Sequence, residues 1–291
     1  MNTQPLLSSM HTHTTFCDGK NDVETMCLTA YEMKLYAIGF SAHSPVSRQT
    51  GIPSYWNLQD EDVEEYVAEV LDAKKRWQGK LAVFLGYETD YIKDRRSPLD
   101  DDIISLNLDY QIGSVHFLFP ENGADPFTVD GSAEEFEKGL KEGFNGDAQA
   151  LMHSYYDAQL EMIALGGFDI LGHADLLKKN TLGKNLWPKE IEIIRQREVA
   201  FAAAGAGIVI EVNTGGINRK KVNELYPSPE FLHIIREYEI PVIITADAHN
   251  AKDINGNYDY ALQMLKLAGI NEHVLLKEKI YDKAVWHKEN I

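Results

Sequence analysis

Short apolar runs alternate along this chain with longer amphipathic stretches. In the stretch Asp60–Trp77, apolar residues such as Val63, Tyr66 and Val70 recur at helical spacing. The apolar runs predict seven strands: Leu6–His13, Ala37–Ala42, Leu81–Tyr87, Tyr110–Val115, Phe168–Leu171, Gly207–Val212 and Pro241–Ala246. The amphipathic stretches predict helices at about Asp22–Leu35, Asp60–Trp77, Ala148–Leu165, Lys189–Ala204 and Tyr258–Ala268, with further helix starts at Ser97-Pro98, Ser132 and Ser228-Pro229. The pattern from His273 onward favours neither a helix nor a strand.

Strand and helix thus alternate about seven times. Parallel strands need long crossover connections, so this order predicts an α/β fold with a parallel sheet. No linker rich in Ser, Gly or Pro divides the chain, and we therefore expect one domain over residues 1–291. Periodicity alone does not distinguish a closed barrel from an open, doubly wound sheet.

Composition narrows the classes of partner. The formal net charge is −17 over 291 residues, and no Lys/Arg run is longer than Arg219-Lys220-Lys221. Nucleic acid and anionic membranes are therefore not expected as partners. An anionic substrate would need local attraction, which bound metal cations would supply. The chain has only two cysteines, which suits a reducing compartment. We see no apolar run long enough for a membrane span and no signal-peptide pattern, and we therefore expect a cytoplasmic protein.

Residues able to bind metal follow nearly every predicted strand. They are His11, His13, His43, Glu88, His116, His173, Asp175, Asp247 and His249. A lone histidine is more often an ordinary core or surface residue, but unrelated histidines have no reason to recur at strand ends. A barrel brings the carboxyl ends of all its strands to one mouth. This placement therefore favours the barrel.

The local spacing also suits metal binding. His11 and His13 lie two residues apart, as do Asp247 and His249, so on a strand each pair points to one face. Both members of a pair can then reach one metal or two adjacent metals. Imidazole and carboxylate ligands together suit Zn, Mn or Fe.

These residues resemble the motifs of the PHP family (polymerase and histidinol phosphatase) of metal-dependent phosphoesterases. The matching segments are His11-Thr-His13-Thr-Thr-Phe-Cys-Asp18-Gly19, Ser41-Ala-His43, Gly86-Tyr-Glu88, Ser114-Val-His116, Gly172-His173-Ala-Asp175 and Ala246-Asp247-Ala-His249. They cover Met10 to about Asn250. The resemblance implies a distorted TIM-like (β/α)7 barrel of the PHP type, formed by the whole chain as one metallophosphoesterase domain.

The resemblance also implies three divalent metals and their ligands. The first set is His11, His13, Glu88 and Asp247; the second is Glu88, His116 and His173; the third is Asp18, His43 and His249. Glu88 would bridge the first two metals. Many relatives carry a histidine at the position that Asp18 takes here.

Further segments, among them Glu88-Thr-Asp90-Tyr-Ile and Glu211-Val-Asn213-Thr-Gly-Gly-Ile, resemble the histidinol-phosphate phosphatases within the family. The implied reaction is hydrolysis of L-histidinol phosphate in histidine biosynthesis, by a hydroxide that bridges two metals. Besides the bridging Glu88, Asp247 or His249 would assist the leaving group.

Basic residues on the loops after the strands are the candidates for binding the phosphoryl group. They are Arg219, Lys178, Lys179 and Arg48. Two alternative functions stay open. One is a phosphoesterase for a nucleotide or another small phosphate ester, and the other is a non-catalytic, metal-binding regulatory module.

Overall fold

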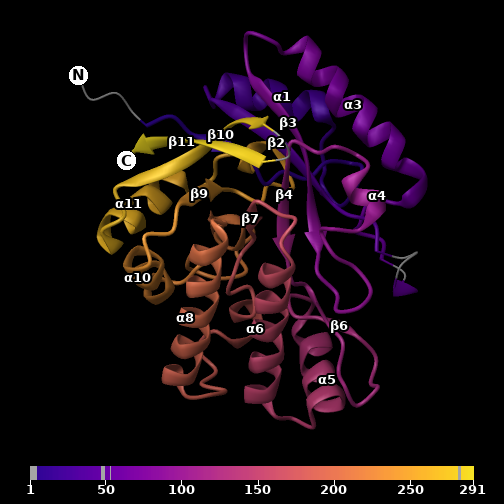
Figure 1. The fold of residues 1–291 in the computed structure, drawn as a ribbon, viewed down its shortest axis with the longest axis vertical. Coiled ribbons are helices and arrows are strands. Elements are labelled where there is room, and N and C mark those ends of the chain that lie inside the picture. Colours follow the sequence, from indigo (N-terminus) through magenta and orange to yellow (C-terminus); the bar gives the residue numbers. More distant parts are fainter. Residues whose placement is uncertain (1–4, 47–49, 53, 281–282) are drawn as a thin grey trace.

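The computed structural model of the chain describes residues 5–46, 50–52, 54–280 and 283–291. Within these ranges, seven parallel strands form one sheet in the order β1-β2-β3-β4-β7-β8-β9 (Figure 1). The strands are β1 (Ser8–Ser9), β2 (Ala37–His43), β3 (Ala82–Asp90), β4 (Tyr110–Ser114), β7 (Ile170–Leu171), β8 (Val209–Asn213) and β9 (Val242–Thr245). Each neighbouring pair is parallel, as the alternation of apolar runs and helices predicts.

The sheet curls until its two edges meet. Thr12 forms a parallel bridge with Ala248, just beyond β1 and β9. Two hydrogen bonds make this contact: His13 N donates to Ala248 O at 2.9 Å, and Ala248 N donates to His11 O at 3.0 Å. The predicted distorted TIM-like barrel is therefore confirmed. β1 is shorter than the predicted strand Leu6–His13, because its chain turns from pairing with β2 to this contact at the far edge.

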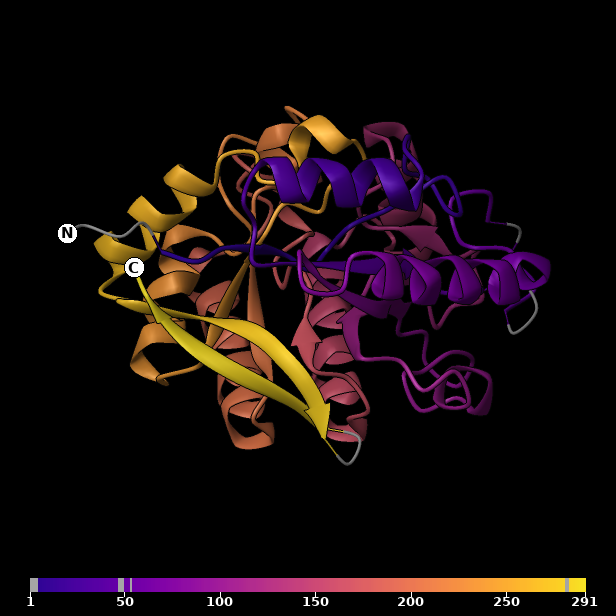
Figure 2. The ribbon, with the colours of Figure 1, turned by 90° about the horizontal axis from the view of Figure 1, so that it is seen from above.

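The helices cover the outside of the barrel (Figures 1 and 2). They are α1 (Val23–Glu32), α3 (Val63–Arg76), α4 (Asp101–Ile104), α5 (Ala133–Phe144), α6 (Ala148–Leu165), α7 (Lys178–Thr181), α8 (Lys189–Ala206), α9 (Gly215–Asn218), α10 (Pro229–Glu237) and α11 (Tyr258–Ala268). Two short 3-10 turns, η1 (Asp60–Asp62) and η2 (Ala251–Asp253), precede α3 and α11. Within the described residues, no helix is both long and apolar enough to cross a membrane.

Helix caps follow the sequence signals in most places. Ser132 accepts from Glu135 N, and the Glu135 side chain accepts from Ser132 N, which completes the predicted capping box of α5. Ser228 caps α10, and Pro229 is its first residue. The expected helix start at Ser97-Pro98 is wrong: the Ser97 hydroxyl accepts from Leu99 N in a local turn, and α4 begins only at Asp101.

Side chains fill the barrel interior below the mouth. The Tyr110 hydroxyl crosses this space and donates to Met10 O at 2.5 Å. A Cβ atom added to Gly39 or Gly86 would collide with the Tyr110 ring. The glycine of the Gly86-Tyr-Glu88 motif therefore makes room for an aromatic residue that links the strands two residues before Glu88.

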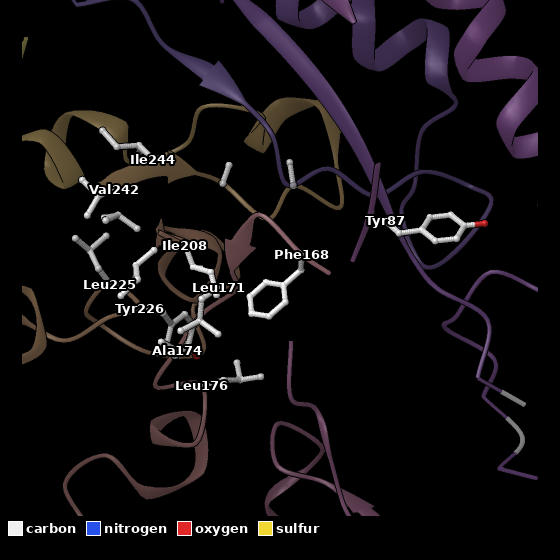
Figure 3. Packing of buried hydrophobic residues seen from close by; sticks show 14 of the residues in the cluster. Tyr87, Phe168, Leu171, Ala174, Leu176, Ile208, Leu225, Tyr226, Val242 and Ile244 are labelled. Atoms are coloured by element: carbon white, nitrogen blue, oxygen red, sulfur yellow. The ribbon is translucent and has the colours of Figure 1, made fainter. Parts of the chain in front are cut away.

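A larger apolar layer lies between the strands and the helices. Its residues on the β7, β8 and β9 side include Leu171, Ile208, Leu225, Tyr226, Val242 and Ile244 (Figure 3). All are at most 4% exposed. Because β8 and β9 are buried on both faces, their sequences read as nearly continuous apolar runs.

The segment that begins near His273 forms an antiparallel hairpin, β10 (Glu272–Ile280) with β11 (Lys283–Asn290). Val274 and Leu276 of β10 are buried against residues that begin the barrel strands, including Ala37, Tyr110 and Val209. The hairpin lies across the end of the barrel where the strands begin (Figure 2). It closes the end opposite to the one where the strands finish. A smaller hairpin of β5 (Phe117–Leu118) and β6 (Phe127–Thr128) follows β4.

Candidate metal centre

The predicted ligands come together where the parallel strands end. His11, His13 and Asp18 follow β1, His43 ends β2, Glu88 lies in β3, His116 follows β4, His173 follows β7, and Asp247 and His249 follow β9. Most of these side chains are at most 6% exposed. Asp18 and His249 lie nearer the surface, with side chains 32% and 20% exposed.

Glu88 is the hub of the cluster. Among the described residues, five imidazoles place a nitrogen within 3.6 Å of its carboxylate oxygens. They are His43 at 2.9 Å, His11 at 3.1 Å and His13 at 3.6 Å on Oε2, and His173 at 2.8 Å and His116 at 3.6 Å on Oε1. Each oxygen thus faces a separate group of histidines, which is the arrangement that a bridging carboxylate requires.

Two further carboxylates complete the cluster. Asp247 Oδ1 lies 3.4 Å from His13 Nε2 and 3.3 Å from His249 Nδ1. Asp18 Oδ2 lies 3.0 Å from His249 Nε2, and its Oδ1 lies 3.6 Å from His13 Nδ1 and 3.8 Å from His43 Nε2. His13 therefore stands between the two aspartates, with one ring nitrogen toward each.

The donor set fits divalent metals. His11 Nε2, His13 Nε2, His43 Nδ1 and Glu88 Oε2 are buried, and although the three nitrogens lie 2.9–3.6 Å from that oxygen, none of the four atoms has a partner with good hydrogen-bond geometry in the part of the chain that the structure describes. Unpaired polar atoms in a dry interior are unfavourable unless something else binds them. Groups of three or four donors have ligand atoms within 4.8 Å of one another. Ligands about 2.1 Å from a tetrahedral Zn²⁺ are themselves about 3.4 Å apart.

Two carboxylates outside the predicted ligand set orient the histidines. Glu211 Oε1 accepts from His11 Nδ1 at 2.5 Å, and Asp90 Oδ1 accepts from His116 Nδ1 at 2.7 Å. Each bond leaves the opposite ring nitrogen, Nε2, directed at Glu88. A carboxylate behind a ligating histidine fixes its tautomer and raises its basicity.

Sequence reasoning assigned no role to Glu211 or Asp90. Glu211 also accepts from Thr245 Oγ1 at 2.6 Å and from His173 N at 2.7 Å, so it joins three strand ends. The available signal was their position: both acids lie near strand ends, and Asp90 stands two residues after Glu88. On a strand that spacing places both side chains on one face.

The cluster's charges shift one another's pKa values. Burial opposes ionisation of Glu88, but the facing imidazoles of His11, His43 and His116 hold its pKa well below the usual range. Burial likewise opposes protonation of His116, while Asp90 and Glu88 together raise its pKa to about 10. Burial and the neighbouring imidazoles of His249 and His43 lower the pKa of His13 to about 3.

Those predicted phosphate-binding cations that the structure describes do not share one position, because each pairs with different carboxylates. Arg219 donates to Asp247 Oδ2 and to Asp247 O, both at 2.8 Å, and lies 2.9 Å from His249 Nδ1. Lys179 pairs with Asp130 at 3.3 Å. Lys178 is buried in another place, between Asp175 and Glu224, each at 3.1 Å. Arg48 lies outside the described residues.

A cavity of about 460 Å³ opens above the cluster. Its lining combines the metal-ligand candidates other than His11 and His13 with Arg219, Lys179 and an unpredicted cation, Lys221. Trp56 forms part of the wall, with its ring 4.8 Å from that of His43. Lys178 is not among the lining residues; it lines a separate cavity of about 250 Å³ with Asp175 and Glu224. The cavity above the cluster has room for a small phosphate ester.

The barrel and its histidine–carboxylate cluster define a class of protein, and the sequence comparisons agree. The family profile described as "PHP domain" matches residues 9–215. That match spans more than half of the chain. The protein therefore belongs to the PHP family.

Relatives that match over most of this chain bear the name histidinol-phosphatase. One from Deinococcus radiodurans is 30% identical over 90% of this chain and 94% of its own length. Another, from Bacillus subtilis, is 25% identical over 87% of this chain and 97% of its own.

Solved structures share the fold. A Listeria monocytogenes protein described as a histidinol phosphatase superposes with a TM-score of 0.75 at 24% identity, covering 87% of this chain and 99% of that one. The histidinol phosphate phosphatase from Lactococcus lactis subsp. lactis, solved with zinc, L-histidinol and phosphate, has a TM-score of 0.68 at 18% identity, covering 96% and 98%.

Proposed function

We propose that this protein is a metal-dependent phosphomonoesterase that hydrolyses L-histidinol phosphate to L-histidinol and phosphate, a step of histidine biosynthesis. The observation that carries the proposal is Glu88 at the centre of five imidazoles beneath an open cavity. The substrate is inferred from the full-length relative that is 30% identical and bears the name histidinol-phosphatase. This intact ligand set argues against a purely regulatory module.

We infer that three ligand sets hold the metals. His11, His13, Glu88 and Asp247 form the first; Glu88, His116 and His173 form the second; Asp18, His43 and His249 form the third, with His13 beside it. Zn, Mn or Fe suits these donors. Bound metals would supply an acidified water near neutral pH and neutralise the phosphoryl oxygens.

The protein's own residues hold and shape this site. Glu211 and Asp90 keep the Nε2 atoms of His11 and His116 turned inward. Arg219 donates a hydrogen bond to Asp247 Oδ2, so that Oδ1 is left facing His13 and His249. Asp247 and His249 stay our candidates for handling the leaving-group proton, since both adjoin the cavity.

Phosphoryl oxygens would be bound by cations that face the cavity. Arg219 and Lys179 line it, as does Lys221, which has no ion pair with any described residue. Lys178 is excluded from this role because Asp175, Glu224 and the Leu225 carbonyl hold its ammonium in a different place. The phosphate-binding set that we propose is therefore Arg219, Lys221 and Lys179.

The first experiment tests the metal centre. In E88Q, the neutral amide is a poor bridging ligand, so bound metal falls and phosphatase activity drops at least 100-fold. Metal content is measured by elemental analysis and activity by phosphate release. E134Q is the matched control, because Glu134 is exposed on α5 and does not line the cavity. Full metal content and activity in E88Q would refute the assigned bridge.

The second experiment tests the substrate. Enzyme treated with a chelator is inactive, and Mn²⁺ or Zn²⁺ restores hydrolysis of L-histidinol phosphate. The comparison substrates are a nucleoside monophosphate and p-nitrophenyl phosphate, at equal metal loading. A higher kcat/KM for the nucleotide would favour the alternative, a nucleotide phosphoesterase, and would leave the reaction class intact.

We also propose that residues 1–291 form one domain. β9 pairs with β8 and the β10–β11 hairpin packs under the barrel, although both lie beyond the matched residues 9–215. A cytoplasmic location fits the two free cysteines, Cys17 and Cys27. The strongly acidic chain makes nucleic acid an unfavourable partner.

A further inference from the structure

One wall of the active-site cavity is acidic although the cavity is proposed to bind a phosphate ester. Asp130 and Glu135 both line it, beside the metal-ligand candidates and the cations. Neither acid belongs to any group of donors positioned to hold a metal among the described residues. Glu135 has a structural role, because its Oε2 accepts from Ser132 N in the capping box. Asp130 has no comparable role in a helix cap.

The structure holds Asp130 firmly at the cavity edge. On one side of it, Val129 N donates to His116 O at 2.8 Å. The Asn180 side chain donates to both Val129 O and Gly131 O, at 3.0 and 3.2 Å. The backbone around Asp130 is thereby fixed next to His116, one of the metal-ligand candidates.

The Asp130 carboxylate keeps acceptor capacity. Lys179 Nζ lies 3.3 Å from Oδ2 and also donates to the Asp130 carbonyl. No hydrogen bond from a described residue reaches Oδ1, and the side chain is 30% exposed. A carboxylate accepts several hydrogen bonds, so a ligand in the cavity can still bind it.

A negative charge here is unfavourable for most phosphate esters. The negative charge of Asp130 would repel the further phosphate groups of a nucleotide, and the hydroxyls of a sugar phosphate would make only the weaker hydrogen bonds of neutral donors. A substrate with an ammonium group beside its phosphate would gain a charge-assisted hydrogen bond instead. L-Histidinol phosphate has this character, since its amino group is protonated near neutral pH.

We propose that Asp130 is the specificity-determining residue that binds the ammonium group of the substrate while the metals and Arg219 take its phosphoryl group. This inference rests on the proposed function and deepens it. Asp130 acts on the choice of substrate, and the chemistry at phosphorus belongs to the metal cluster.

The test is a cycle of two enzymes and two substrates. Metal-loaded wild type and D130N are compared on L-histidinol phosphate and on 3-(imidazol-4-yl)propyl phosphate, which lacks only the amino group. Wild type prefers the amino substrate by about 10- to 100-fold in kcat/KM, the range expected for one hydrogen bond between charged groups. In D130N that ratio falls close to one, mainly through a higher KM for L-histidinol phosphate.

E134Q is the control. Glu134 lies in the first turn of α5, close to Asp130 in the chain, but it is exposed and does not line the cavity. Its substrate ratio stays that of wild type. An unchanged ratio in D130N would overturn the role of Asp130. If D130N does not fold, the wild-type enzyme tests the proposal by itself. A wild-type ratio near one between the two substrates would then overturn the role of Asp130. Faster wild-type turnover of a nucleoside monophosphate than of either imidazole compound would instead refute the proposed function.

Discussion

At the scale of single residues, the metal centre depends on side chains that face away from the cavity. Glu211 lies at the end of β8 and is fully buried. It binds His11 through a short hydrogen bond and the His173 backbone through another. A buried carboxylate is stable there only because these donors offset its desolvation. Its effect on chemistry passes through the orientation of two metal-ligand candidates.

The variant E211Q tests this role. The amide keeps the shape but loses the charge, so His11 becomes less basic and is held in place less firmly. We expect metal affinity to fall by about 10- to 100-fold, as is usual when a partner behind a ligating histidine is replaced. Competition with a chelating dye measures the affinity. E198Q, at an exposed site on α8, is the control, and wild-type affinity in E211Q would contradict the assignment.

At the scale of elements, the β10–β11 hairpin closes the barrel end that lies opposite to the metal centre. Leu276 and Val274 are buried among residues that begin the strands. The neighbouring β10 residues Lys277 and Glu278 are exposed. A hairpin alone is at best marginally stable in water. Its packing against the barrel therefore stabilises both parts.

We expect L276A to lower the free energy of unfolding by about 2–5 kcal/mol, the usual effect of removing a buried leucine side chain. Urea denaturation measures this change. I280A in the same strand is the control, since Ile280 is 44% exposed, and it should change stability by less than about 0.5 kcal/mol. Folded L276A should keep its kcat. A large loss of kcat at low temperature would show that the hairpin also shapes the metal centre.

At the scale of the whole molecule, the metal centre joins distant parts of the chain. Its ligand candidates extend from His11 to His249, and the contact of Thr12 with Ala248 closes the barrel beside them. Metals held by the proposed ligands would link the segments after β1 and β9 to β3 directly. Metal binding is therefore coupled to the stability of the entire barrel.

Metal removal should accordingly lower the Tm by about 5–10 °C, because a ligand present at 100 times its Kd adds about 2.7 kcal/mol to stability. Differential scanning calorimetry with and without a chelator measures the shift. The shift should shrink as the pH falls, since protons compete with the metals for the imidazole nitrogens, first at His116, whose pKa Asp90 and Glu88 raise to about 10. E88Q should show a smaller shift at any pH. Identical Tm values with and without metal would contradict this coupling.

Local patterns were sufficient for much of the fold and for the main ligand set. The predicted strand Ala37–Ala42 and helix Tyr258–Ala268 match β2 and α11 closely. The strand is buried on both faces, so its consecutive residues are mostly apolar, and the helix shows regular amphipathic spacing. The hairpin after His273 was not predicted. Its alternating residues pack only against the completed barrel, so the local pattern is weak.

The sequence by itself determined the parallel barrel and the gathering of ligands at one mouth, because parallel strands direct their carboxyl ends the same way. Only the tertiary structure decided which charged side chains reach the cavity above the metal-ligand candidates. It buried Lys178 beside Asp175 and brought Lys221 and Asp130 to the cavity. It also joined Glu211 to His11 across 200 residues of chain. Contacts of that range depend on how loops and strand ends meet in space, and spacing along the chain does not encode them locally.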